Sequence, residues 1–184
     1  MYLFKTSPTP SGHTPEGGVV VGSVNARRRL LVFEDPQCPD CRQFEELSGD
    51  LLRREVAAGA VAVEYRIRCC HGLGSVRAAN ALALAAEVGR FDQLRREMFG
   101  TKPSEGSGGF TADDLITLGW RAGLHHPQYA TAIRHGRYEQ WARKLDKRFK
   151  RQNPYGVPAA VLDGQLLASG VLYDPQTLGE LVRG

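Results

Sequence analysis

The 184-residue sequence predicts an α/β fold in which a block of helices interrupts two groups of strands. Segments typical of strands lie near both ends of the chain, at 19–21, 30–33, 61–67 and 157–168. Between 76 and 151, apolar residues instead recur at steps of three and four, which is typical of helices with one buried face. A chain of this length can bury a full core as one domain, or as one domain that carries an insertion.

The composition is that of an ordinary globular protein, and no apolar run approaches the length of a membrane span. Residues 1–18 are rich in Pro, Ser, Thr and Gly and lack the apolar core of a signal peptide, so we expect a flexible tail there. As the sequence stands, this predicts a cytoplasmic protein; an extracytoplasmic location is expected if Met1 follows a trimmed leader. The net charge of +4 does not by itself indicate a nucleic-acid partner.

The N-terminal part follows the order strand, strand, helix, strand. Residues 19–21 are a short candidate strand, and the apolar run at 30–33 predicts a buried one. A break at Pro36 separates this run from a helical pattern that ends near Gly59. Residues 61–67 then alternate apolar and polar side chains, as a half-buried strand does.

The middle of the chain is helical in character. An Ala- and Leu-rich helix is predicted from 76 to 88, and a second short helix follows from about 91 to 99. A Gly-, Ser- and Pro-rich loop at 101–109 precedes a capping-box spacing that predicts a helix from 111 to 122. A single apolar stripe then predicts a longer helix from 135 to 151.

The last segment returns to strands and ends in a helix. A strand that includes Pro158 is predicted at 157–162, and Asp163-Gly164 is a strong hairpin signal before a returning strand at 165–168. Asp174, followed by proline, predicts the start of a closing helix.

Cys38 and Cys41 form a C-x-x-C motif between the buried strand and the first turn of the helix. The free N–H groups and positive dipole end of a helix stabilise a thiolate at Cys38, and Cys41 lies one turn later, where it can close a disulfide. Pro39 suits this turn because its missing N–H needs no partner there. We therefore predict a redox dithiol. The alternatives are incidental cysteines and half of a zinc site, for which Cys70 and His71 are nominal further ligands.

Cys69 and Cys70 are adjacent, and neighbouring cysteines bridge each other only with strain, so the four cysteines do not form a disulfide scaffold. We expect both to be small buried thiols beside a loop. The alternative is a second redox pair that passes electrons to the main dithiol.

The densest charge in the chain lies between 134 and 151. Because the apolar stripe takes the inner face of the predicted helix, we expect the charges on a solvated outer face. Docking of an acidic partner is the alternative, and nucleic acid is less favoured. We expect Trp120 and Trp141 to be core residues. The basic side chains are Arg134, Arg137, Arg143, Lys144, Lys147, Arg148, Lys150 and Arg151.

Together with the order of elements, three stretches resemble the DsbA-like thiol–disulfide oxidoreductases. The stretches are VFEDPQCPDC at 32–41, SVRAANALALA at 75–85 and GVPAAVLDG at 156–164. The resemblance covers roughly 19–184 and implies a thioredoxin-like fold, a central mixed sheet flanked by helices. That domain is expected at 19–68 and 154–184, with an inserted helical subdomain at 69–153.

The resemblance also implies a mechanism and its partners. Cys38 is expected to attack and form a mixed disulfide with substrate, and Cys41 to resolve it. Val157 and Pro158 are expected to form a cis-proline loop that orients the substrate chain. No cofactor is implied, because the electrons reside on the two cysteines. The expected partners are protein thiols or disulfides and an unidentified redox partner.

The sequence departs from the family at two positions. Where oxidases of the family often carry histidine before the second cysteine, this chain has Asp40, whose charge opposes thiolate formation. We therefore expect Pro39 and Asp40 to set the redox poise and to make the disulfide a milder oxidant. The buried carboxylate that usually lies six residues before the first cysteine is replaced by Val32, so Glu34 is the candidate proton acceptor for Cys41.

Two other classes of function remain open at this point. One is an enzyme related to the glutathione transferases or isomerases on the same scaffold, which the intact C-x-x-C opposes. The other is a non-catalytic module that binds zinc or a partner protein.

Overall fold

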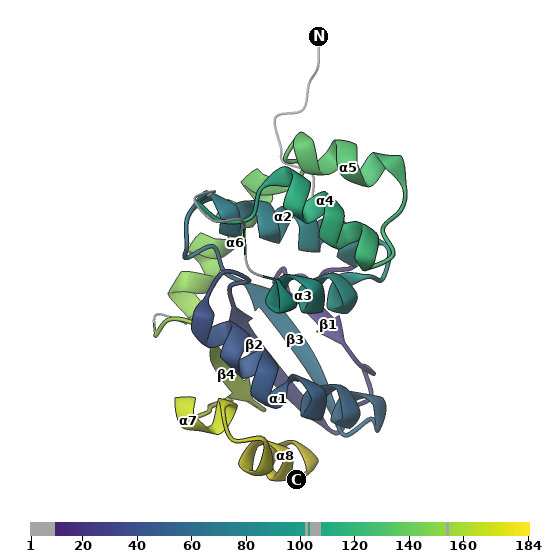
Figure 1. The fold of residues 1–184 in the computed structure, drawn as a ribbon. Helices are drawn as coiled ribbons and strands as arrows, with labels where there is room; N and C mark the ends of the chain where they lie inside the picture. The colour runs from purple at the N-terminus through teal and green to yellow at the C-terminus, as the bar shows by residue number, and fades with distance from the viewer. Residues whose placement is uncertain (1–9, 102, 104–107, 154) are drawn as a thin grey trace.

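A computed structural model describes residues 10–184 apart from 102, 104–107 and 154, and it shows the predicted α/β fold, with a mixed sheet flanked by helices (Figure 1). Among these residues, five strands form one sheet in the order β1-β3-β2-β4-β5. β2 and β3 are parallel, and the other neighbouring strands are antiparallel. The strands are β1 (Val19–Val21), β2 (Arg28–Glu34), β3 (Val61–Ile67), β4 (Ala159–Leu162) and β5 (Gln165–Leu166).

Helices cover both faces of the sheet, and α2 to α6 lie between β3 and β4 in the sequence, where the helical insertion at 69–153 is expected. The apolar side chains of these inserted helices join the same core as those of the sheet. The helices are α1 (Pro39–Ala57), α2 (Leu73–Glu87), α3 (Phe91–Gly100), α4 (Ala112–Arg121), α5 (Pro127–Arg134), α6 (Glu139–Gln152), α7 (Ser169–Leu172) and α8 (Pro175–Arg183). None of the described helices is long and apolar enough to cross a bilayer.

β2 is the central strand of the sheet, and its side chains alternate between the two faces. Leu30 and Val32 belong to the large core cluster that contains Phe44 of α1. Phe33 points the other way and packs edge-on against Phe149 of α6, with ring centroids 6.1 Å apart. Burying an aromatic or branched side chain of this kind contributes about 1.5–3 kcal/mol. This alternation fixes the strand and therefore the position of the C-x-x-C motif that follows it.

The turns that were predicted from sequence are present. Gly59, at φ +73°, follows the end of α1, and Thr111 forms the capping box with Asp114 at the start of α4. Asp163 and Gly164 both have positive φ, at 47° and 88°, as the central residues of a tight hairpin between β4 and β5 require.

Several predicted helices and strands differ from the observed ones. α5 was not predicted, because it is only eight residues long and buries two side chains, Tyr129 and Ile133, one turn apart. α6 begins at Glu139 rather than 135, since α5 and a turn occupy the residues before it. The returning strand ends at Leu166 instead of 168, and α7 follows. Trp120 is 57% exposed and not a core residue.

The expected tail at 1–18 is described from residue 10 on, and residues 13–17 lie against α6; residues 1–9 lie outside the described residues. The Thr14–Gly18 turn is closed by two backbone hydrogen bonds of 2.8 Å. The His13 ring packs edge-on against Trp141 at 4.7 Å between centroids, and Gly17 lies against Leu145. The glycine- and proline-rich sequence therefore forms a tight turn that packs against α6. The predicted loop at 101–109 lies partly outside the described residues.

Candidate active site

The turn between β2 and α1 is shaped by the side chain and carbonyl of Asp35. Its Oδ1 accepts the N–H of Gln37 at 2.9 Å, and its carbonyl accepts the N–H of Cys38 at 3.0 Å. Asx turns of this kind reverse the chain over a few residues. Cys38 is the N-cap of α1 and Pro39 its first residue, so Cys38 and Cys41 both lie at the first turn, as predicted.

The two cysteines are buried free thiols whose pKa values are shifted in opposite directions. The pKa of Cys38 is lowered to about 6, chiefly because the Cys41 S–H donates a hydrogen bond to the Cys38 thiolate. Burial opposes this shift, whereas the N–H groups of Cys41 and Asp40 and the charge of His71 add to it. Burial, and then the Cys38 thiolate, raise the pKa of Cys41 far above its ordinary value. At neutral pH, Cys38 is therefore mostly a thiolate, whereas Cys41 holds its proton.

The loop before β4 lies directly over this dithiol. The Val157–Pro158 peptide bond is cis, as predicted, and the Val157 carbonyl oxygen lies 3.6 Å from Sγ of Cys38. Val157 also packs against the small apolar cluster formed by Cys38, Cys41 and Phe99. The fold thus brings together two segments that are 119 residues apart in the chain.

Glu34, the candidate proton acceptor, is completely buried and is bound to a cation. Its two carboxylate oxygens accept Nε and Nη2 of Arg95 at 2.6 and 2.7 Å. The Sγ atom of Cys41 instead accepts the backbone N–H of Asp35 at 3.5 Å. Burial raises the pKa of Glu34, and Arg95 opposes that rise. Since both oxygens are engaged by a guanidinium, a proton-acceptor role for Glu34 stays a prediction without a supporting contact.

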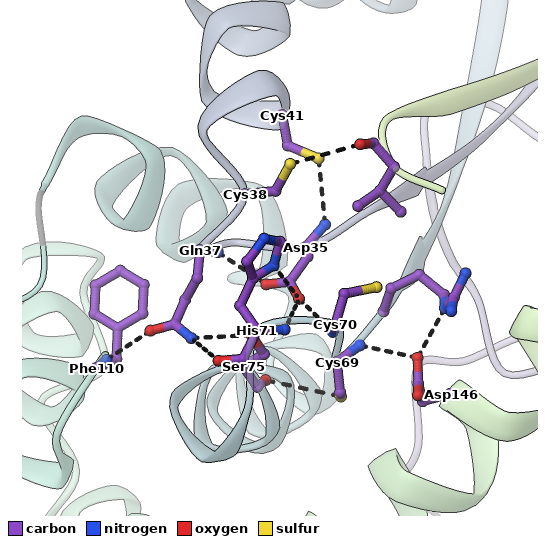
Figure 2. A network of polar contacts seen from close by, with 12 residues as sticks. Asp35, Gln37, Cys38, Cys41, Cys69, Cys70, His71, Ser75, Phe110 and Asp146 are labelled. Carbon is purple, nitrogen blue, oxygen red and sulfur yellow. Dashed lines mark hydrogen bonds and ion pairs between the residues drawn. The ribbon is translucent and has the colours of Figure 1, made fainter. Parts of the chain in front are cut away.

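A polar network that sequence reasoning missed connects the motif to the loop between β3 and α2 (Figure 2). Oδ2 of the buried Asp35 carboxylate accepts the N–H of Cys70 at 2.6 Å and lies 3.3 Å from Nδ1 of His71. The Gln37 side chain donates to the His71 carbonyl and to Oγ of Ser75, both at 3.0 Å. Asp35 and Gln37 directly precede the motif in sequence, but their partners in this network lie more than 30 residues away. Only the fold shows the network.

The expectation of two small buried thiols is wrong for Cys70, which is exposed, and Cys69 is only half-buried. The Cys69 N–H donates to Asp146 at 3.0 Å, and Arg68 forms an ion pair with the same carboxylate at 2.7 Å. Burial raises the pKa of both thiols, so both are protonated at neutral pH. Protonated thiols are poor nucleophiles, which distinguishes this pair from Cys38.

Within the described ranges, no three His, Cys, Asp or Glu side chains come together in a way that could hold a metal ion. Of the two nominal zinc ligands, His71 is bound to Asp35 and Cys70 is exposed.

A sequence model of the thioredoxin family matches residues 14–181, nearly the whole chain. The chain belongs to the thioredoxin family. A comparison with curated proteins found no match.

Solved structures of DsbA type share the fold of this thioredoxin-family chain. MdbA from Actinomyces oris, a thiol–disulfide oxidoreductase, has a TM-score of 0.80 at 17% identity, covering 97% of this chain and 92% of that one. Oxidised BdbD from Bacillus subtilis has a TM-score of 0.78 at 17% identity, with 96% and 97% covered. Reduced DsbA from Mycobacterium tuberculosis has a TM-score of 0.69 at 24% identity, with 89% and 93% covered. The thioredoxin-like fold with a helical insertion is therefore that of the DsbA-type proteins.

Proposed function

We propose that this protein is a DsbA-like enzyme that exchanges disulfides with protein substrates through Cys38 and Cys41. The observation that carries the proposal is that two thiols one helical turn apart have pKa values shifted in opposite directions. A lowered pKa makes Cys38 a thiolate, while Cys41 stays a protonated, buried thiol. The similar structures, which are described as thiol–disulfide oxidoreductases, support the same assignment.

The exchange proceeds in two steps that balance electrons and protons. In the oxidising direction, a substrate thiolate attacks Sγ of Cys38 in the Cys38–Cys41 disulfide, and Cys41 leaves and takes up a proton. A second substrate thiolate then attacks the substrate sulfur of the mixed disulfide, and Cys38 leaves as a stabilised thiolate. The substrate has lost two electrons to the enzyme. The reducing direction reverses these steps, with Cys38 attacking and Cys41 resolving.

The cis-proline loop supports a role in orienting the substrate. The Val157 carbonyl is 3.6 Å from Sγ of Cys38, so a chain joined to that sulfur lies beside this backbone. An extended peptide can then pair with the loop in the manner of an added β-strand, and Pro158 presents no competing N–H. We assign Val157 and Pro158 to substrate binding on this basis.

The redox poise follows from the acidity of Cys38. Its pKa of about 6 lies between about 7 in thioredoxin and about 3.5 in DsbA. A more stable thiolate stabilises the reduced form and makes the disulfide more oxidising. We therefore propose an oxidant milder than DsbA. In the cytoplasm such a dithiol works as a reductant or isomerase, and outside it the same dithiol oxidises exported proteins; the redox partner differs accordingly.

Trapping of the mixed disulfide tests the proposed function. The Cys41→Ser variant lacks the resolving thiol, so it should accumulate a covalent complex when mixed with a protein that contains an accessible disulfide. Non-reducing electrophoresis should show this complex, and a reductant should release it. The matched Cys38→Ser variant should form none. A Cys41→Ser variant that forms no more adduct than Cys38→Ser contradicts the proposal.

A further inference from the structure

We infer that His71, which Asp35 holds in place, is the electrostatic partner of the Cys38 thiolate. It supplies the positive charge that a histidine between the two cysteines would otherwise supply. The inference rests on the proposed function and adds the residue that adjusts the dithiol. The two residues between the cysteines are Pro39 and Asp40, neither of which is cationic. A positive charge near the sulfur must therefore come from another part of the fold.

The backbone of the loop between β3 and α2 fixes the place of His71. Oδ2 of Asp35 accepts the N–H of Cys70 at 2.6 Å and that of His71 at 3.3 Å. Gln37 holds the His71 carbonyl from the other side at 3.0 Å, and its own position is fixed by Ser75. Residues just before Cys38 thus bind the loop that carries His71.

The side chain of His71 is oriented by the same carboxylate. Nδ1 lies 3.3 Å from Oδ2 of Asp35, which as an acceptor selects the ring form with a proton on Nδ1. The other ring nitrogen, Nε2, forms no hydrogen bond with any residue that the structure describes. Figure 2 shows the imidazole between the Asp35 carboxylate and the Cys38 side chain, so this second nitrogen is left on the side of the sulfur.

Exposure allows His71 to exchange its proton with water. Its side chain is 43% exposed, whereas Asp35 is completely buried. When the ring is protonated, its charge lies between the buried carboxylate and Cys38, and it lowers the pKa of Cys38. Asp35 is thus a positioning residue that acts on Cys38 through His71.

Other groups face the same sulfur without supplying a positive charge. Cys41 and Asp40 come from α1, Cys70 comes from the β3–α2 loop, and Tyr173 follows α7. Burial, together with the charge of Cys38, raises the pKa of Cys70 and of Tyr173, so both are neutral when Cys38 is a thiolate. The Asp40 side chain is negative and exposed. Removing His71 therefore leaves the thiolate without its cationic neighbour and beside the unneutralised charge of Asp35.

The pH dependence of Cys38 alkylation tests this inference. Iodoacetamide reacts with the thiolate, and tandem mass spectrometry of the peptide that contains Cys38 and Cys41 locates the label on Cys38. We expect His71→Gln to raise the apparent pKa of Cys38 by about one unit, the lower end of what a nearby opposite charge produces. The reduction potential of the dithiol should fall in the same variant. His71→Lys, which keeps a positive charge, should restore both values at least in part.

His125→Gln is the matched control, because His125 is an exposed histidine in the loop before α5 and lies outside the network of Figure 2. It should leave the pKa of Cys38 and the reduction potential at wild-type values. Equal Cys38 pKa values in wild type and His71→Gln would overturn the inference. If His71→Gln does not fold, His71→Asn, which also removes the positive charge, takes its place: a raised Cys38 pKa supports the inference, and an unchanged Cys38 pKa overturns it. Failure of the Cys41→Ser variant, with His71 intact, to trap a mixed disulfide would instead reject the proposed function, because alkylation requires no exchange.

Discussion

Arg95 binds both carboxylate oxygens of Glu34, with Nε at 2.6 Å and Nη2 at 2.7 Å, and both side chains are almost fully buried. The guanidinium also contacts Glu45 at 2.6 Å and lies 4.2 Å from the centre of the Tyr65 ring. Burial is the largest single effect and lowers the pKa of Arg95, but the charges of Glu34, Tyr65 and Glu45 and the hydrogen bonds to Glu34 together raise that pKa well above the usual value. This ion pair joins α3 to the end of β2, immediately before the active-site turn.

Replacing Arg95 by leucine should strongly destabilise the protein. The change leaves Glu34 buried without its cation, and breaking a buried pair in this way costs about 3–5 kcal/mol. Urea unfolding of wild type and Arg95→Leu measures the loss. Arg96→Leu is the control, since Arg96 is the exposed neighbour on α3 and should change stability by less than about 0.5 kcal/mol. Equal losses in the two variants would show that the ion pair contributes little.

Replacing Asp40 by histidine should lower the pKa of Cys38. The substitution replaces a negative charge beside the sulfur by a group that can be positive. A negative neighbour raises the pKa of a thiol, and a positive neighbour lowers it. Asp40→Asn, which only removes the charge, should give an intermediate value. Absorbance of the thiolate at several pH values measures the shift. A Cys38 pKa in Asp40→His that equals or exceeds the wild-type pKa would contradict the expectation that Asp40 moderates the site.

The stability of the reduced protein should depend on pH through Cys38. The folded-state pKa is about 6, and that of an unfolded cysteine is about 8.5. Between these values the unfolded state binds more protons, so the free energy of unfolding rises with pH over this window and the gain is lost as pH falls through 6. Urea unfolding of wild type and Cys38→Ser under a reductant, at pH 5.5 to 8.5, measures the difference. A difference that is constant with pH would refute the lowered pKa.

Much of the fold could be predicted because local patterns agree with it. The alternation at Val61–Ile67 and the apolar run before Glu34 both became strands, and the hairpin at Asp163 formed with the expected positive φ. Short elements were missed for a physical reason. A helix such as α5 has too few turns to show a stripe, and its existence depends on packing of Tyr129 and Ile133 against neighbouring helices.

The motif residues of the site could be predicted, and the residues around them could not. Cys38 and Cys41 are local in sequence, and the cis bond at Val157–Pro158 followed from a family resemblance. His71 was noticed only as a nominal zinc ligand. Its contact with Asp35 spans 36 residues and depends on how the loop after β3 meets the turn after β2, which no local pattern specifies.

The reduction potential of the Cys38–Cys41 pair, measured against glutathione buffers, tests the central claim most directly. Wild-type protein is equilibrated in buffers of known ratio, and the fraction of disulfide is read after alkylation, with Cys38→Ser as the control that cannot form the bond. We predict a reversible disulfide with a potential between about −270 mV, the value for thioredoxin, and about −120 mV, the value for DsbA. The absence of a reversible disulfide between these two cysteines would contradict the account.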